Sequence, residues 1–176
     1  MEAGTRIISI VGPESTGKST LAKRLGEHFS APVVPEFARE YLTNKHGDYQ
    51  ESDLILIAEG QLRSELDALV LSPEVLICDT DILVIQIWQK YKYGRVSDSI
   101  NNLRAQQQKR FYLLTYPDLE WEPDPLRENS NNRLAIFELY KTALDNMKVE
   151  YAVVRGREIE RMNSALVQLK SRFPKH

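Results

Sequence analysis

The stretch Gly12–Ser19, with the sequence G-P-E-S-T-G-K-S, decides the fold of this chain. It follows the apolar run Ile7–Val11 and leads into a helical pattern that begins near Ser19. A glycine-rich turn between a strand and a helix lets successive backbone N–H groups surround phosphate oxygens, and the helix N-terminus adds partial positive charge. The stretch therefore predicts a phosphate-binding loop for a nucleoside triphosphate.

The polar residues of this loop have distinct expected tasks. Lys18 would reach the β- and γ-phosphates, and the hydroxyl of Ser19 would bind Mg²⁺. The residues that we expect to contact the nucleotide are Gly12, Glu14, Ser15, Thr16, Gly17, Lys18, Ser19 and Thr20.

The 176 residues have the size of one domain, residues 1–176, and a net charge of −2 from 23 basic and 25 acidic residues. This mixed charge does not favour nucleic acid or a membrane surface as a partner. Because no apolar run approaches the ~20 residues of a membrane span and the N-terminus lacks a signal-peptide pattern, we expect a cytoplasmic protein. Nothing in the sequence indicates an oligomeric state. The single cysteine, Cys78, is expected to be a buried, inert thiol.

Five short apolar runs alternate with helical patterns along the chain. Strands that are connected by helices form a parallel sheet covered on both faces. The predicted fold is therefore α/β, a P-loop NTPase fold with a five-stranded parallel sheet. The runs are Ile7–Val11, Pro32–Pro35, Val75–Cys78, Phe111–Thr115 and Tyr151–Val154.

Helical periodicity predicts which helix faces are buried. The helix that Ser52 is expected to cap buries a leucine-rich stripe between Leu54 and Leu69, and Glu65 is assigned to its exposed face. The residues that the last helix is expected to bury are Ile159, Met162, Leu166 and Leu169.

Three carboxylates lie just after predicted strands, where ligands gather in an open parallel sheet. Asp79 has the position of a Walker B carboxylate, which binds Mg²⁺ directly or through water, although Asp79 or Thr80 could instead cap the following helix. Asp81 is either a proton acceptor for a substrate hydroxyl or a residue of the first helical turn. Glu36 is a candidate to hold sugar hydroxyls or to act as general base, with Arg39 as its candidate ion-pair partner.

Residues 118–132 are rich in proline, asparagine and carboxylates and have no apolar period, which predicts a long functional loop. The segment has the character of a mobile lid. Arg127 lies in it and Arg133 just after it, and arginines on a closing loop neutralise the charge of a transferring phosphoryl group. Arg127 is the stronger candidate. Gly156, after the fifth strand, either contacts adenine through backbone groups or forms a plain turn.

The motifs that are absent narrow the class of nucleotide-binding protein. The chain has no N-K-x-D guanine signature after a late strand and no D-x-x-G after the third strand, so a GTPase is not expected. It also lacks helicase motifs and the length of a motor ATPase. A carboxylate after the second strand together with an arginine-bearing lid favours a small-molecule kinase.

With the phosphate-binding loop, four later features resemble the ribosylnicotinamide kinase domain of bacterial NadR proteins, in the same order. The resemblance implies a nucleoside-kinase-like fold with ATP and Mg²⁺ as cofactors. It also implies transfer of the γ-phosphoryl group of ATP to the 5′-hydroxyl of nicotinamide riboside, giving nicotinamide mononucleotide. Full NadR proteins carry further domains, and we expect this chain to be the kinase domain alone. The four features are E-F-A-R-E-Y at Glu36–Tyr41, D-T-D at Asp79–Asp81, W-E-P-D-P-L-R at Trp121–Arg127, and Arg133.

These motifs together predict the tasks of several residues within one phosphoryl-transfer site. Lys18 would hold ATP, Ser19 and Asp79 would organise Mg²⁺, and either Glu36 or Asp81 would deprotonate the acceptor hydroxyl. Arg127 and Arg133 would neutralise charge as the lid closes.

The substrate expectation depends on the residues around Glu36. The NadR pattern has an aromatic residue just before this glutamate, where the present chain has Pro35. A cationic pyridinium ring prefers aromatic faces, for which Phe37, Tyr41, Trp88 and Trp121 are candidates. Two alternatives stay open: another nucleoside or polynucleotide 5′-kinase, which for a polynucleotide should show a basic track, and an ATP-binding regulatory module without fast chemistry.

Overall fold

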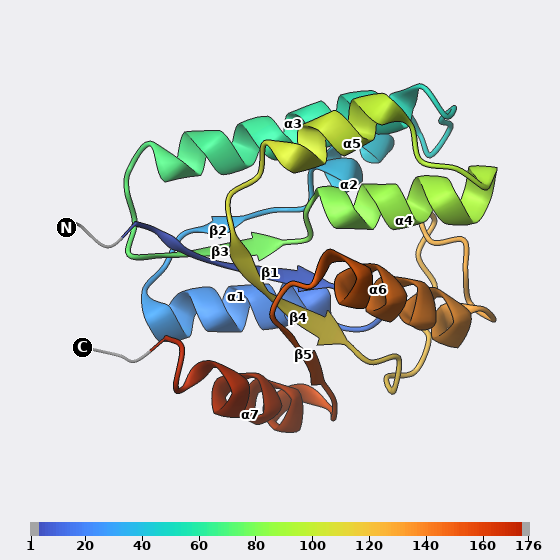
Figure 1. The fold of residues 1–176 in the computed structure, drawn as a ribbon. Helices are drawn as coiled ribbons and strands as arrows, with labels where there is room; N and C mark the ends of the chain where they lie inside the picture. The colour runs from blue at the N-terminus through green and yellow to red at the C-terminus, as the bar shows by residue number, and fades with distance from the viewer. Residues whose placement is uncertain (1–3, 174–176) are drawn as a thin grey trace.

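The computed structural model of the chain describes residues 4–173. Its strands are β1 (Arg6–Val11), β2 (Val33–Val34), β3 (Val75–Asp79), β4 (Arg110–Thr115) and β5 (Tyr151–Val154). They form one sheet in the order β2-β3-β1-β4-β5, and every pairing is parallel (Figure 1). The predicted α/β fold with a five-stranded parallel sheet is confirmed.

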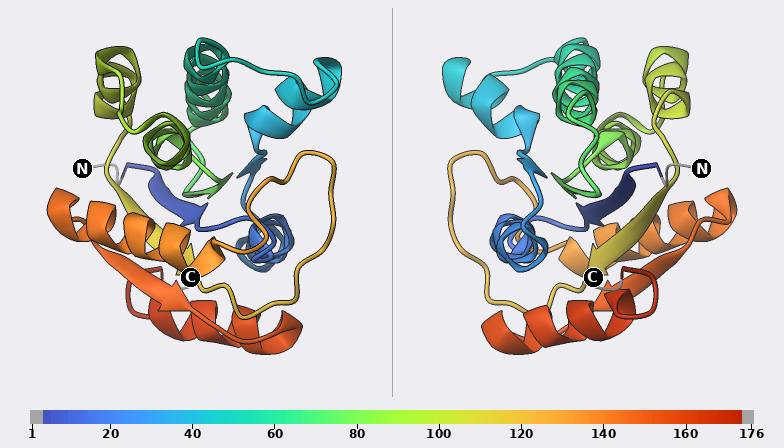
Figure 2. Two further views of the ribbon diagram at one scale, coloured as in Figure 1. Left: turned by 90° about the vertical axis from the view of Figure 1, so that its right-hand side faces the viewer. Right: turned by 90° about the vertical axis from the view of Figure 1, so that its left-hand side faces the viewer.

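Helices cover both faces of this sheet. They are α1 (Lys18–Phe29), α2 (Phe37–Asn44), α3 (Asp53–Leu69), α4 (Ile82–Tyr93), α5 (Asp98–Ala105), α6 (Arg133–Met147) and α7 (Glu158–Leu169). α1 and α7 pack on one face, and α3, α4 and α6 lie on the other, with α2 and α5 packed against α3 (Figures 1 and 2). None of the helices in the described part of the chain is long and apolar enough to span a membrane.

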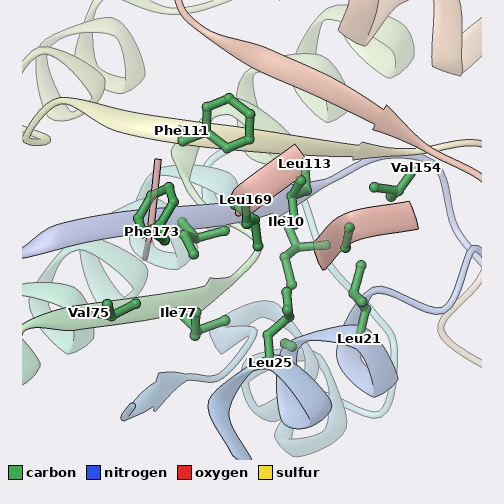
Figure 3. Packing of buried hydrophobic residues seen from close by; sticks show 13 residues of the cluster. Ile10, Leu21, Leu25, Val75, Ile77, Phe111, Leu113, Val154, Leu169 and Phe173 are labelled. Carbon is green, nitrogen blue, oxygen red and sulfur yellow. The ribbon is translucent and has the colours of Figure 1, made fainter. Parts of the chain in front are cut away.

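The core beneath the phosphate-binding loop anchors α1 to the sheet. Ile10, Ile77 and Leu113 project from neighbouring strands and meet Leu25 of α1 and Leu169 of α7 (Figure 3). All five side chains are fully buried. Because burial of one such side chain contributes about 1.5–3 kcal/mol, this layer fixes the start of α1, and with it the preceding loop, at the carboxyl end of β1.

The opposite face of the sheet buries the charged residue Glu65, which was predicted to be exposed to solvent. Glu65 of α3 is 1% exposed, and its two carboxylate oxygens accept from Arg110 at 2.8 Å and 2.6 Å. The prediction that Glu65 faces water is wrong, because Arg110 at the start of β4 neutralises it inside the core. A buried pair of this kind is favourable only when its geometry and hydrogen bonds are nearly complete.

The start of α3 also differs from expectation. Ser52 occupies the residue before the helix but makes no capping hydrogen bond with its side chain. Instead, the carboxylate of Asp53 accepts from the backbone N–H of Gln50 at 2.7 Å. Leu54 and Leu62 of the predicted leucine stripe are buried, whereas Leu66, near the end of the helix, is 46% exposed.

The buried stripe of α7 is shifted from the predicted one. Ile159 is 68% exposed, so its predicted burial is wrong. The buried positions are Arg161, Ala165 and Leu169, which are spaced one helical turn apart. A charged residue therefore takes a place on the buried face that the hydrophobic pattern assigned to apolar side chains.

The sheet order determines where a ligand can bind. β1 lies between β3 and β4. After β1 the chain builds β2 and β3 on one side of this strand, and it then builds β4 and β5 on the other side. Open parallel sheets bind ligands at the carboxyl ends of the strands near such a switch point. Here the phosphate-binding loop follows β1, and residues 116–132, which form no helix or strand, follow β4. In Figure 2 this second segment arches beside the N-terminal end of α1.

Candidate active site

The loop between β1 and α1 has the backbone shape that a phosphate-binding turn requires. Gly12 has a φ of 143°, and a Cβ at this position would lie 2.8 Å from the carbonyl oxygen of Thr115. Gly17, the last residue before α1, has a φ of 73°. The hydroxyl of Thr16 lies 2.6 Å from that of Thr115, which ties the turn to the end of β4. Both glycines of the motif are therefore required by the local backbone.

Lys18 begins α1 and extends across the loop. Its ammonium donates to the carbonyl of Pro13 at 2.7 Å. Burial lowers the pKa of Lys18, and the carboxylates of Glu36, Asp79 and Glu14 oppose that shift. A buried cation in this position is suited to bind phosphate oxygens that enter the loop.

Ser19 and Asp79 form the candidate magnesium site. Burial raises the pKa of Asp79, whereas a hydrogen bond with the Ser19 side chain and the charge of Lys18 act to lower it. Its Oδ1 is buried and has no hydrogen-bond partner among the described residues. Mg²⁺ prefers oxygen ligands and is usually bound by one or two protein groups together with phosphates and waters. The hydroxyl and the orphaned carboxylate oxygen fit such an ion. In residues 4–173 no cluster of three or more His, Cys, Asp or Glu side chains forms a metal site made by protein alone.

Glu36 lines the same cavity as the phosphate-binding loop and lies just before α2. Burial raises its pKa, and the nearby charge of Lys18 lowers it. A carboxylate with a raised pKa accepts a proton more readily, as a general base must. The predicted pairing of Arg39 with Glu36 is not formed; Arg39 pairs instead with Asp124 at 3.0 Å, because residues 118–132 approach α2.

Asp81 lies away from the cavity. Its side chain is fully buried, and Oδ1 accepts from the backbone N–H of Leu83 at 2.9 Å, so Asp81 caps α4. Its other oxygen lies 3.6 Å from Arg110. Of the two roles predicted for Asp81, these contacts support the one at the helix terminus. The cap predicted at Asp79 or Thr80 is formed by Asp81.

A cavity of about 730 Å³ is lined by the phosphate-binding loop. Glu36 and the aromatic residues Trp88, Tyr91 and Tyr140 line the same cavity. Burial raises the pKa of Tyr140 well above its usual value, so its phenol stays protonated and can donate a hydrogen bond. Of the predicted aromatic candidates, Trp88 lines the cavity, whereas Phe37, Tyr41 and Trp121 do not.

Residues 118–132, the predicted lid, are bound to the phosphate-binding loop by polar contacts. The carboxylate of Glu14 accepts from the backbone N–H groups of Glu128 and Asn129 at 3.2 Å and 2.9 Å. The hydroxyl of Ser15 accepts from the backbone N–H of Glu122 at 2.9 Å. Two side chains of the predicted nucleotide-binding set therefore hold the lid beside the cavity.

The two candidate arginines occupy different places. Arg127 lines the cavity, and its Nη1 lies 3.4 Å from the Ser15 hydroxyl while donating to the carbonyl of Glu122 at 2.6 Å. Arg133 does not line the cavity; it donates to the carbonyls of Ser15 and Leu119 at 3.2 Å and 2.9 Å. Arg127 is thus brought to the phosphate-binding loop as predicted, whereas Arg133 supports the backbone of the loop and the lid.

Arg161 of α7 is a cavity residue that the sequence analysis missed. It donates to the carbonyls of Thr16 and Gly156, both at 2.9 Å. Gly156 itself does not line the cavity; it has a φ of 91°, and its N–H donates to Asp118 at 2.8 Å. Its predicted adenine contact stays a prediction. The signal for Arg161 was its position on the same helix face as the buried Leu169.

The parallel sheet, the phosphate-binding loop and the cavity at its carboxyl edge define a P-loop nucleotide-binding domain. The chain belongs to the AAA domain family, whose model matches residues 7–161. It is homologous to the trifunctional NAD biosynthesis/regulator protein NadR of Salmonella typhimurium and of Escherichia coli, with 28% and 27% identity over 161 residues. Each match covers 88% of this chain and 39% of the relative, so the chain spans about two fifths of the length of these relatives.

Solved structures share the fold over almost the whole chain. A NadR protein in complex with NAD and AMP-PNP has a TM-score of 0.80, and a NadR protein in complex with NR has 0.82; each is 19% identical and is matched over 98% of this chain. The matches cover 50% and 52% of those two chains. Thymidylate kinase from Ehrlichia chaffeensis has a TM-score of 0.70 at 15% identity, covering 96% of this chain and 98% of that one. The predicted kinase-like fold is therefore confirmed.

Proposed function

We propose that this chain is an ATP-dependent small-molecule kinase that phosphorylates the 5′-hydroxyl of nicotinamide riboside to give nicotinamide mononucleotide. One observation carries the proposal: a single cavity is lined both by Lys18 of the phosphate-binding loop and by Glu36, Trp88 and Tyr140. Direct phosphoryl transfer needs donor and acceptor in one enclosed space. The homology to NadR and the fold shared with NadR in complex with NR support nicotinamide riboside as the acceptor.

In the proposed donor site, the backbone N–H groups of the loop and the ammonium of Lys18 bind the phosphates of ATP. Ser19 and Asp79 would hold Mg²⁺, which when bound neutralises phosphate charge. Arg127, which already contacts the Ser15 hydroxyl, adds positive charge from the lid. These groups stabilise the negative charge that spreads over the transferring phosphoryl group.

In the proposed acceptor site, Glu36 takes the proton of the attacking hydroxyl. Its raised pKa and its place on the cavity wall suit this role better than the buried cap formed by Asp81. Trp88 and Tyr91 offer aromatic faces to a cationic pyridinium ring, and the charge of Glu36 complements that ring.

The test is a phosphoryl-transfer assay with Mg-ATP and a panel of acceptors: nicotinamide riboside, common nucleosides, pantothenate and a short oligonucleotide. We expect turnover with nicotinamide riboside, detected as nicotinamide mononucleotide by mass, and loss of that turnover in Lys18→Ala. Turnover on another acceptor and none on nicotinamide riboside would overturn the substrate. Binding of ATP without transfer to any acceptor would favour a regulatory module instead.

We also infer that residues 1–176 act as one domain and that the reaction takes place in the cytoplasm, where ATP is plentiful. The first inference is supported by the single sheet on which the described residues are built. Limited proteolysis that releases a stable subfragment of the folded chain would contradict it.

A further inference from the structure

The buried Arg161 connects three segments that surround the donor side of the cavity. It is 3% exposed. Nη1 donates to the carbonyl of Thr16 in the phosphate-binding loop, and Nε to that of Gly156 after β5, both at 2.9 Å. Nη2 donates to the carbonyl of Tyr116 after β4 at 3.1 Å and pairs with the carboxylate of Asp118 at the start of the lid. One side chain thus fixes the relative positions of the loop, the lid and the turn before α7.

The chemistry of arginine is well matched to this position. A guanidinium carries five N–H groups in fixed directions, whereas a lysine carries one ammonium that cannot reach all four acceptors at once. Burial lowers the pKa of Arg161, and Asp118 raises it. A buried cation is tolerated only when its donors are satisfied, so the three carbonyls and the carboxylate are what keep the guanidinium in place.

The turn that Arg161 holds has an unusual backbone. Gly156 has a φ of 91° and Glu158 a φ of 41°, and a Cβ at Gly156 would lie 2.7 Å from the Cβ of Glu160. A non-glycine residue in the left-handed region persists only where its surroundings determine the conformation. Residues 157–161 line the cavity, so this fixed turn forms part of the wall beside the phosphate-binding loop.

Both carboxylate oxygens of Asp118 take part in the same arrangement. Its Oδ1 pairs with Arg161, and its Oδ2 accepts from the N–H of Gly156 at 2.8 Å. Asp118 therefore links the guanidinium of Arg161 to the backbone of the turn at Gly156.

We propose that Arg161 is a positioning residue for the donor nucleotide. It holds the phosphate-binding loop and the turn before α7 in one geometry. This inference rests on the proposed function, because it concerns the nucleotide that the kinase would use. The contacts of Arg161 do not include the acceptor residues Glu36, Trp88 and Tyr140. Its loss should therefore affect the donor and spare the acceptor.

The test compares the wild type with Arg161→Met and Arg161→Lys, and with Arg172→Met as a matched control. Arg172 follows α7, pairs with Glu150 at 3.0 Å and lies over the ring of Phe111. We expect the Kd for Mg-ATP, measured by calorimetry, to rise about tenfold to a hundredfold in Arg161→Met, because the loop and the turn would no longer be held in the geometry that binds the nucleotide. Arg161→Lys should show a smaller rise. The KM for the acceptor should change less than about twofold.

The outcomes separate the two proposals. A wild type that binds no Mg-ATP contradicts the proposed function. If the wild type binds Mg-ATP and a folded Arg161→Met binds it equally well, the positioning role is contradicted. An equal loss of affinity for the donor and for the acceptor would also contradict it. If Arg161→Met does not fold, Asp118→Ala takes its place: it leaves Arg161 its three carbonyls but frees the turn at Gly156. We expect weaker Mg-ATP binding, and unchanged binding would overturn the inference.

Discussion

Burial acts on Lys18 and Glu36 in opposite directions. It lowers the pKa of the ammonium and raises the pKa of the carboxyl, while the charge of each group stabilises the charge of the other. Phosphate that enters the loop would strengthen the positive charge of Lys18, and an acceptor hydroxyl would meet a carboxylate of raised basicity. At the scale of residues, the partial desolvation of two opposite charges, Lys18 and Glu36, thus preorganises the site.

Arg127 provides a direct test of charge stabilisation from the lid. We expect Arg127→Ala to fold normally and to lose about a hundredfold or more in kcat, because arginine beside a transferring phosphoryl group stabilises its transition state. The KM for the acceptor should change little. Steady-state kinetics on the purified variant measures both effects. Arg63→Ala, which removes an exposed arginine of α3, is the control, and equal kcat values for the two variants would refute the role of Arg127.

The ionisation of Glu36 should determine how turnover depends on pH. A general base acts in its ionised form, so kcat/KM should rise with pH through the pKa of Glu36, which burial places above the ordinary value of 4.5. We expect Glu36→Gln to lose most turnover and this acid limb. The exposed Glu40 on the next helical turn supplies the control Glu40→Gln, which should keep the wild-type profile. An unaltered acid limb in Glu36→Gln would assign the base elsewhere.

The sequence predicts some site residues better than others for a physical reason. The spacing of the motif specifies the backbone of the turn, so the places of Gly12, Lys18 and Ser19 follow directly. Position after a strand fixes the location of a carboxylate but not the direction of its side chain. Glu36 therefore lines the cavity as predicted, whereas Asp81 turns to the start of α4.

At the scale of elements, the connection from α2 to α3 depends on one carboxylate. Asp53 accepts from the N–H of Gln50, from Lys45 and from the hydroxyl of Tyr41, and these hydrogen bonds lower its pKa to about 2. A lowered carboxyl pKa stabilises the folded state above the unfolded value of 3.8, and this stabilisation is lost as the pH falls toward 2.

Asp53→Asn should therefore be less stable than the wild type at neutral pH, and the difference should shrink as the pH falls from about 5 toward 3. Urea unfolding across this pH range measures the two free energies of unfolding. Asp48→Asn, at an exposed position of the same connection, should follow the wild type at every pH. A difference that stays constant down to pH 3 would show that the charge of Asp53 is not what stabilises the connection.

Helix patterns predict the elements of this fold well and their charged core positions poorly. The alternation of apolar runs and helical patterns predicted all five strands of the sheet. Periodicity assigns a helix face from hydrophobicity alone, so it cannot place Glu65 or Arg161 on a buried face. The groups that neutralise them, Arg110 and Asp118, lie on other elements and are paired only by the folded chain.

At the scale of the whole molecule, Arg110 connects elements that lie on both sides of β1, the strand at which the order of the sheet reverses. It begins β4, pairs with Glu65 of α3, lies 3.6 Å from Asp81 before α4, and donates to the hydroxyl of Ser9 in β1 at 3.3 Å. These four groups are all buried. Since Asp81 follows the candidate magnesium ligand Asp79 by two residues, the cluster supports the edge of the sheet at which the site is built.

Arg110→Met should lower the free energy of unfolding by about 3–5 kcal/mol, because it leaves two buried carboxylates without their cation. Glu65→Gln should cost less, since the glutamine oxygen still accepts from Arg110 and the charge of Asp81 still balances the guanidinium. Urea unfolding of both variants at neutral pH tests this order. Lys109→Met removes the neighbouring exposed cation and should leave the stability within about 0.5 kcal/mol of the wild type. If Arg110→Met unfolded at the same urea concentration as Lys109→Met, the buried cluster would not be what holds α3, β4 and the start of α4 together.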